Sequence, residues 1–171
     1  MKKLIALLLT VAMVAAMAVG CGNKPAASNN AALEGTMEEN VNKIIEKNPV
    51  EFMGGTMPVD LTDVDALFYE TGLQTADDIT EAAVFGPMIG SIPFSMVMVR
   101  VAEGSDAKTV AESMKAGIDP RKWVCVEADD LMVAGYADVV MLIMVASDSG
   151  LTAQSYVDAF GQVVGGEPTV Y

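Results

Sequence analysis

Apolar residues recur at helical spacing in four stretches of the chain. Within each stretch they stand three or four positions apart, which places them on one face of a helix. Thr36 and Glu39 form a capping box ahead of the first stretch, and Val64, Leu67 and Phe68 are the expected buried face of the second. The expected helices, ended by Asn-Pro or by glycine, cover residues 37–48, 62–71, 105–117 and 152–164.

Other stretches favour β-strands. Residues 94–101 alternate with β-branched side chains, and residues 139–146 are uninterrupted apolar sequence. The second run is too short to span a bilayer, so we expect a central strand buried on both faces. Shorter strands are expected at residues 80–85, 123–126 and 131–134, and a loop at residues 49–60. Helices and strands mix without a strict βαβ repeat, which predicts the α+β class, with helices packed on a mostly antiparallel small sheet.

The first 20 residues have the three-part layout of a secretory signal peptide. Lys2 and Lys3 precede an apolar run over residues 4–19, which is shorter than the roughly 20 residues of a membrane span. Residues 18–21, Ala-Val-Gly-Cys, resemble the lipobox of bacterial lipoproteins. The resemblance implies cleavage between Gly20 and Cys21 and a diacylglyceryl group on the Cys21 thiol. Ordinary secretion and an uncleaved anchor are the alternatives.

This interpretation divides the chain into three parts. Residues 1–20 are the lipoprotein signal peptide, residues 21–35 the lipidated cysteine and a flexible tether, and residues 36–171 a single α+β globular domain. The tether is small and polar and lacks periodicity. Two or three acyl chains on one residue anchor a protein stably, so we expect the domain on the extracytoplasmic face of the cell membrane.

The charge balance narrows the choice of partners. The chain has 10 basic and 23 acidic residues, a net charge of −13. Lys2 and Lys3 leave with the signal peptide, so the remainder has 8 basic and 23 acidic residues, a net charge of −15. Phosphate backbones and anionic headgroups repel such a body. We therefore expect no nucleic-acid binding, and membrane contact only through the lipid on Cys21.

A family resemblance rests on the order of several hydrophobic segments. A short helix around residues 64–68 precedes the segment Ala-Ala-Val-Phe-Gly-Pro-Met at residues 82–88, and strands follow at 96–101 and 139–145. In this pattern residues 60–147 resemble the extracytoplasmic lipoproteins of clostridia-type bacteria defined by domain of unknown function 4358. No activity is established for that family, so the resemblance implies a lipoprotein and supplies no catalytic residues.

Candidate catalytic groups are few. The chain has no histidine, which removes Ser-His and Cys-His nucleophile pairs and the commonest zinc ligand. Ser105 and Lys108 match the S-x-x-K pattern of penicillin-binding enzymes, but the companion motifs S-D-N and K-T-G are missing. We interpret Ser105 as a helix cap and Lys108 as a solvated side chain.

Aspartates gather at three places. Their carboxylates could either bind calcium or serve as helix caps and solvated turn residues. The places are residues 60–65, 77–78 and 129–130. None has the glycine and glutamate spacing of an EF-hand, so caps and turns are expected and no metal is assigned.

The sulfur-containing residues also have a simple interpretation. Met96 and Met98 share a strand face, whereas Met141 and Met144 face opposite ways, so core filling is expected instead of a copper(I) site. Cys125 has no intramolecular partner once Cys21 is lipidated. Its alternating neighbours predict a buried, inert thiol in a strand.

These observations favour a lipid-anchored, non-catalytic domain that binds an envelope protein or a small ligand at the cell envelope without a cofactor. A small-molecule-binding lipoprotein associated with transport is the first alternative. An envelope hydrolase that uses Ser105 or carboxylates is the second.

Overall fold

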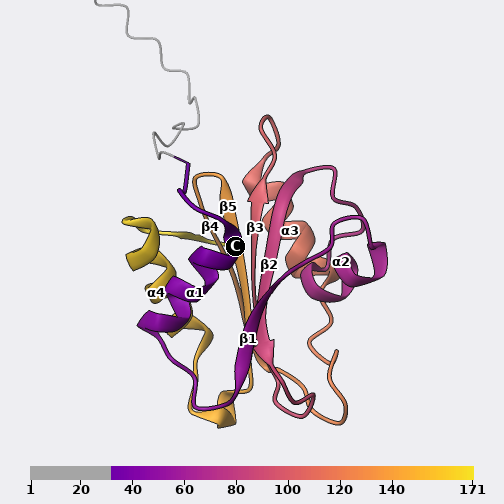
Figure 1. The fold of residues 1–171 in the computed structure, drawn as a ribbon, viewed down its shortest axis with the longest axis vertical. Coiled ribbons are helices and arrows are strands. Elements are labelled where there is room, and N and C mark those ends of the chain that lie inside the picture. The colour runs from indigo at the N-terminus through magenta and orange to yellow at the C-terminus, as the bar shows by residue number, and fades with distance from the viewer. Residues whose placement is uncertain (1–31) are drawn as a thin grey trace, which may run out of the picture.

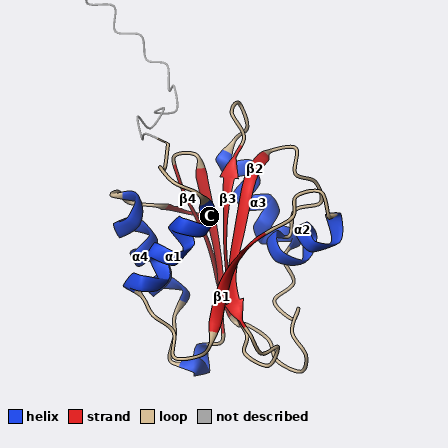
Figure 2. Ribbon diagram, viewed as in Figure 1, coloured by secondary structure: helices blue, strands red, loops and turns tan. Residues whose placement is uncertain are grey.

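The computed structural model of the chain describes residues 32–171, so the signal peptide, Cys21 and most of the expected tether lie outside the described residues (Figure 1). The described residues form an α+β fold with helices on both faces of one antiparallel sheet (Figure 2). This confirms the predicted fold class. In chain order the elements are α1 (Met37–Lys47), β1 (Gly54–Pro58), α2 (Val64–Thr71), β2 (Ile79–Pro87), β3 (Phe94–Val101), α3 (Ala107–Gly117), β4 (Asp130–Tyr136), β5 (Val139–Val145), the 3-10 turn η1 (Ser147–Ser149), α4 (Ala153–Val164) and β6 (Thr169–Val170).

The sheet has six strands in the order β1-β2-β3-β5-β4-β6, and each neighbouring pair is antiparallel. Strands β3 and β5 lie at its centre, where every residue of β5 is buried. Sheets of this kind often leave one face to water, but here helices cover both faces. The central strands are therefore apolar on both sides, as predicted for residues 139–146.

Helices α1 and α4 cover one face of the sheet. Their buried side chains meet the even-numbered residues of β3 in a core that includes Ile44, Met96, Met98 and Phe160. The capping box of α1 is present, because the Thr36 hydroxyl accepts from the Glu39 amide and the Glu39 carboxylate accepts from the Thr36 amide. The bounds of α1 and α4 agree with the helices predicted at residues 37–48 and 152–164 to within about one residue, which confirms both predictions.

Helices α2 and α3 cover the other face, over a second core that includes Leu67, Val97, Met114 and Leu142. Gly72 ends α2 with a φ of 77°, a left-handed conformation that glycine adopts at little cost. Helix α2 begins at Val64, two residues after its predicted start, with Asp63 as its N-terminal cap, and Asp106 caps α3 in place of the predicted Ser105.

One predicted loop, one predicted strand and one predicted helix face were wrong. Residues 54–58, expected in a loop, form edge strand β1, while residues 123–126, expected as a strand, lie in the loop before β4. On α2 only Leu67 of the three expected face residues is buried, and Val64 and Phe68 are exposed. The buried residues of α2 are Leu67 and Thr71, so the helix faces the sheet along a line that leaves Val64 and Phe68 in water.

Candidate functional site

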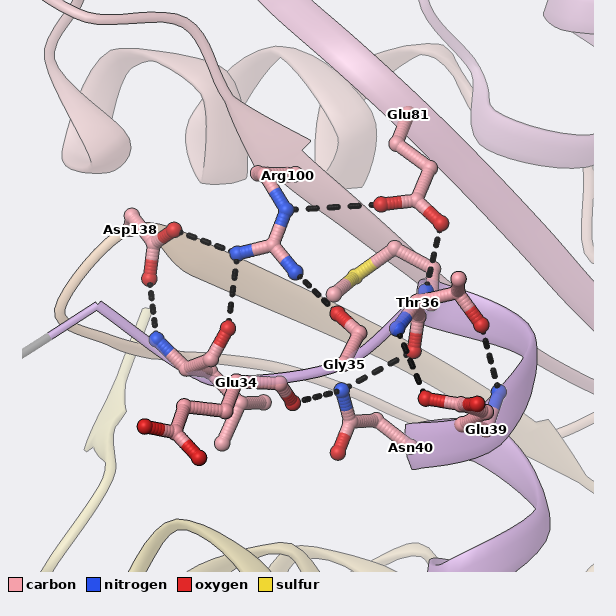
Figure 3. Close-up of polar contacts among 10 residues, drawn as sticks. Glu34, Gly35, Thr36, Glu39, Asn40, Glu81, Arg100 and Asp138 are labelled. Carbon is pink, nitrogen blue, oxygen red and sulfur yellow. Dashed lines mark hydrogen bonds and ion pairs between the residues drawn. The ribbon is translucent and has the colours of Figure 1, made fainter.

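The most extensive polar cluster surrounds Arg100, near the end of β3 (Figure 3). Its guanidinium Nη1 donates to Asp138 Oδ2 over 2.6 Å, and its Nε lies 3.4 Å from Glu81 Oε2. The same guanidinium donates to the main-chain carbonyls of Leu33 over 3.0 Å and Gly35 over 2.7 Å. The Arg100 side chain is 20% exposed, so water screens these contacts only in part.

The strand register explains why these charges meet. Glu81 stands directly opposite Arg100 on β2, after a bulge between Ile79 and Glu81 that shifts the register by one residue. On the other side Arg100 stands opposite Val139, which follows Asp138 in the turn between β4 and β5. Three separate strand ends therefore bring one cation between two carboxylates.

The two carboxylates also hold the chain that enters the domain. Asp138 Oδ1 accepts from the Leu33 amide over 2.9 Å, and Glu81 Oε1 accepts from the Met37 amide over 2.6 Å. Residues 33–35, expected in the tether, are thus fixed to the sheet in the structure. We call Arg100, Glu81 and Asp138 the arginine clamp. Sequence reasoning missed it, although an arginine inside an apolar strand was a visible signal.

A second buried cation is Lys122, whose side chain is 4% exposed. Its Nζ donates to Glu70 Oε2 over 2.6 Å and lies 4.7 Å from the ring centre of Tyr69 and 5.7 Å from that of Trp123. Burial lowers the pKa of Lys122, while the Glu70 carboxylate opposes that shift. These partners fasten the loop before β4 to α2, so the cluster has a structural role.

The structure gives Ser105 and Lys108 separate partners. The Ser105 hydroxyl donates to Asp78 Oδ1 over 2.7 Å, and the Lys108 ammonium lies 3.3 Å from Glu112 Oε1 on the next turn of α3. Lys108 is solvated as expected, but the cap of α3 is Asp106. The arrangement has no lysine beside the serine hydroxyl to take its proton.

The clustered aspartates act mainly as caps and turn acceptors. Asp63 caps α2, and Asp130 Oδ2 accepts from the Ala153 amide at the start of α4. Hydrogen bonds from Thr62 lower the pKa of Asp60, and those from Ser147 lower the pKa of Asp129. Among residues 32–171, no group of three His, Cys, Asp or Glu side chains is placed to hold a metal ion.

The methionines of the central strands fill the two cores. Met96, Met98 and Met141 belong to the core under α1 and α4, and Met144 belongs to the opposite core. The expected facing is therefore confirmed.

The prediction for Cys125 was wrong. Its thiol is exposed, and its φ of 63° is incompatible with a strand. The alternation of residues 123–126 predicted a strand with every second side chain buried. In the structure Val124 and Cys125 are both exposed, so burial in this loop does not follow a period of two.

The end of the sheet away from the arginine clamp, where β4 begins at Asp130, combines an aromatic core with exposed apolar side chains. In the core at this end, the Phe94 ring packs edge-on against Phe85 and Tyr156, with ring centres 5.8 and 5.2 Å apart. Outside the core, Met53, Met88 and Ile89 are 75%, 74% and 59% exposed. The Met88 amide donates to the Met53 carbonyl, which holds the two segments side by side. We call Met53, Met88 and Ile89 the apolar tip.

The described surface also has shallow clefts. One of about 390 Å³ lies between the C-terminal end of α2 and α3, lined by Leu73, Gln74, Asp78, Val110 and Ser113 among others. Its rim residues Gln74, Asp78 and Ser113 are exposed, so a ligand there would keep much of its hydration.

No protein-family model, curated protein or solved structure matches the chain. The resemblance of residues 60–147 to the clostridial lipoprotein family stays a prediction. Among residues 32–171, no helix is long and apolar enough to cross a membrane.

Proposed function

We propose that the protein is a lipid-anchored, extracytoplasmic domain that binds a partner at the cell envelope and is not a catalyst. One observation carries the proposal: the arginine clamp fixes the entry of the chain at one end of the sheet, and the apolar tip lies at the opposite end. A domain held by its first residues at one end presents its other end away from the attachment point.

The clamp gives the expected tether a defined origin. If Cys21 carries the lipid, residues 22–32 link it to Leu33, the first residue that the clamp holds. A flexible segment of that length has a typical span on the order of 20 Å. The body's net charge of −15 repels anionic headgroups, which favours keeping the domain off the bilayer surface.

The binding role is supported by the chemistry of the exposed residues. Met53, Met88 and Ile89 form a cluster of large apolar side chains at one end of a strongly acidic body, although Val64 and Val124 are exposed elsewhere. Methionine side chains adapt to different surfaces, so such clusters suit protein recognition. Ser105 and Lys108, the candidates for hydrolysis, already have other partners.

The anchor is tested by comparing the two cysteines of the chain. The wild-type protein is expected in the membrane fraction, with an N-terminal peptide whose mass includes acyl chains on Cys21. Cys21→Ser is expected to lose both the acyl mass and membrane retention. Cys125→Ser is the matched control, because Cys125 is exposed but lies in a loop of the folded body. It is expected to keep both.

The proposal of a lipid anchor fails if wild-type protein from its native host begins before Cys21 or has an unmodified Cys21 thiol. It also fails if Cys21→Ser stays in the membrane fraction as fully as Cys125→Ser. The binding part has its own test at strand β1, with a readout that does not depend on Cys21.

A further inference from the structure

Strand β1 forms one edge of the sheet, and its hydrogen-bonding pattern leaves one side unpaired within the sheet. The Met88 amide donates to the Met53 carbonyl, and the Val59 amide donates to the Ala82 carbonyl. Because the direction of main-chain groups alternates along a strand, residues 53, 55, 57 and 59 face β2. Gly54, Thr56 and Pro58 therefore direct their main-chain groups outward.

Pro58 fits this pattern, because its missing N–H falls on the outward side and costs no bond to β2. The outward groups are the N–H and C=O of Gly54 and Thr56 and the C=O of Pro58. The opposite edge is strand β6, which has only two residues and pairs with Ala134 and Gly135 of β4, so it offers a shorter open side than β1.

Apolar side chains surround the open edge. Met57 on β1 is 58% exposed, and the apolar tip begins at Met53, directly before the strand. Gly55 stands opposite Gly86 on β2, and an added Cβ at either position would meet no atom within 4 Å. A strand added beside β1 would therefore have room for its side chains next to Gly55, between Met53 and Met57.

The local charge indicates the kind of partner. Residues 52–59 and 86–93 contain no charged side chain, whereas Glu51 and Asp60 lie at either end of the first segment. An apolar strand with basic residues at its ends complements this pattern and is attracted by the net negative body. A second copy of the chain would bring two strongly acidic bodies together, which opposes pairing between two β1 edges.

We propose that β1 receives an added strand from a partner protein, an extended segment of apolar residues flanked by lysine or arginine. Main-chain hydrogen bonds to Gly54 and Thr56 supply affinity, and contacts with Met53 and Met57 supply preference for apolar side chains. This inference deepens the proposed function and rests on its binding part alone.

The test uses the full chain in a mild detergent and a synthetic peptide in which valine and threonine alternate between pairs of lysines. NMR is expected to show saturable shifts of the Gly54 and Thr56 amides and their protection from hydrogen exchange. A peptide with glutamates in place of the lysines is expected to bind about tenfold more weakly.

Two variants at one position isolate the main-chain contact. Both Thr56→Pro and Thr56→Val lose the hydroxyl bond from Thr56 to Asn42, but only proline removes the outward N–H. Thr56→Pro is expected to weaken peptide binding about tenfold relative to Thr56→Val. Protection of the Val59 and Met88 amides reports whether β1 still pairs with β2. If the proline variant loses that pairing, Met57→Lys replaces it, and its added positive charge is expected to weaken binding of the lysine peptide.

Equal peptide affinity in the proline and valine variants, with β1 still paired, overturns the inference. Peptide shifts that avoid Gly54 and Thr56 overturn it as well. Protection of these amides that rises with protein concentration without peptide would identify a second copy as the occupant and also overturn it. None of these outcomes changes the mass of the Cys21 peptide, so failure here is distinguishable from failure of the lipid anchor.

Discussion

The two ends of the sheet are stabilised in different ways. At one end the arginine clamp joins Arg100, Glu81 and Asp138 to the main chain of residues 33–37 (Figure 3). At the other end aromatic rings pack against one another, and the buried Tyr156 hydroxyl has no hydrogen-bond partner among the described residues. The clamp end joins one cation to two carboxylates and to the entering chain. At the opposite end Asp129 and Asp130 accept hydrogen bonds from Ser147 and Ala153, but the aromatic core there depends on burial, and apolar side chains are left in water.

This difference separates two tasks in space. Charged hydrogen bonds fix geometry, so the clamp determines where the chain enters the body. Apolar contacts lack direction, so an exposed apolar tip can accept partners of varied shape. Variants at the two ends therefore test whether this division is real.

The largest effect is expected at the clamp. Arg100→Met keeps the apolar part of the side chain but leaves Glu81 and Asp138, which are 33% and 26% exposed, without their cation. We expect a loss of about 3 kcal/mol in the free energy of unfolding, because breaking a partly buried ion network leaves uncompensated charge. Urea unfolding measures the loss. Hydrogen exchange at the Leu33 and Met37 amides should become faster.

Arg100→Lys is the control for this prediction. Lysine keeps the charge, but its three donors sit on one nitrogen and cannot reach the separated acceptors that Arg100 meets through Nε, Nη1 and Nη2, so an intermediate loss is expected. If Arg100→Met unfolds at the wild-type urea concentration, the clamp adds nothing to stability. If the Leu33 amide exchanges at the wild-type rate in that variant, the clamp does not hold the entering chain.

The next effect concerns the apolar end and appears only at high pH. Burial raises the pKa of Tyr156 to about 12, from an ordinary value of 10.0. The unfolded chain therefore loses its Tyr156 proton first, and the stability of the fold falls as pH rises from 10 towards 12. The loss in the free energy of unfolding that comes from Tyr156 reaches about 2 kcal/mol by pH 12. Tyr156→Phe should remove it, as measured by urea unfolding of both proteins at pH 7 and near pH 12.

At pH 7 the same substitution has a different expected result. Because the Tyr156 hydroxyl is buried without a partner, its removal should leave stability unchanged or raise it by about 1 kcal/mol. A clear loss of stability at pH 7 would show that the hydroxyl is bonded in solution. The aromatic core would then contain a polar contact of its own, and the contrast with the clamp would weaken.

The sequence predicted the parts of the fold that rest on local pattern. The helices α1, α3 and α4 and the strands β3 and β5 follow from apolar periodicity and from turn residues, which act over neighbouring positions. The α+β class follows from their order. Strand β1 was missed because its two glycines and its proline are turn signals, and only pairing with β2 makes an extended edge favourable there.

The polar clusters depended on contacts that no local pattern contains. Arg100 meets Asp138 and the Leu33 carbonyl only after strands from distant parts of the sequence pair. The exposure of Cys125 likewise depends on how the loop before β4 packs over the sheet. The candidate lipidation site, by contrast, is a contiguous motif at Gly20 and Cys21, which is why the sequence suggests it without any fold.

The smallest expected effect distinguishes the two faces of β1 at the apolar end. A Cβ added at Gly54 would lie 2.5 Å from the Phe85 ring, whereas one added at Gly55 would meet nothing within 4 Å. Gly54→Ala should therefore cost about 2 kcal/mol through overpacking of the aromatic cluster. Gly55→Ala should be neutral or stabilise by about 0.5 kcal/mol, because alanine restricts the unfolded chain more than glycine does.

Urea midpoints of the two variants measure this difference directly, since the substitutions are chemically identical and one residue apart. Equal midpoints would mean that Gly54 is not pressed against Phe85 and that the aromatic end is loosely packed. A stabilised Gly55→Ala that still binds the lysine-flanked peptide would show that the space next to Gly55 exceeds what an added strand needs. Loss of peptide binding in that variant, with its fold intact, would show that a side chain of the added strand packs into the space over Gly55.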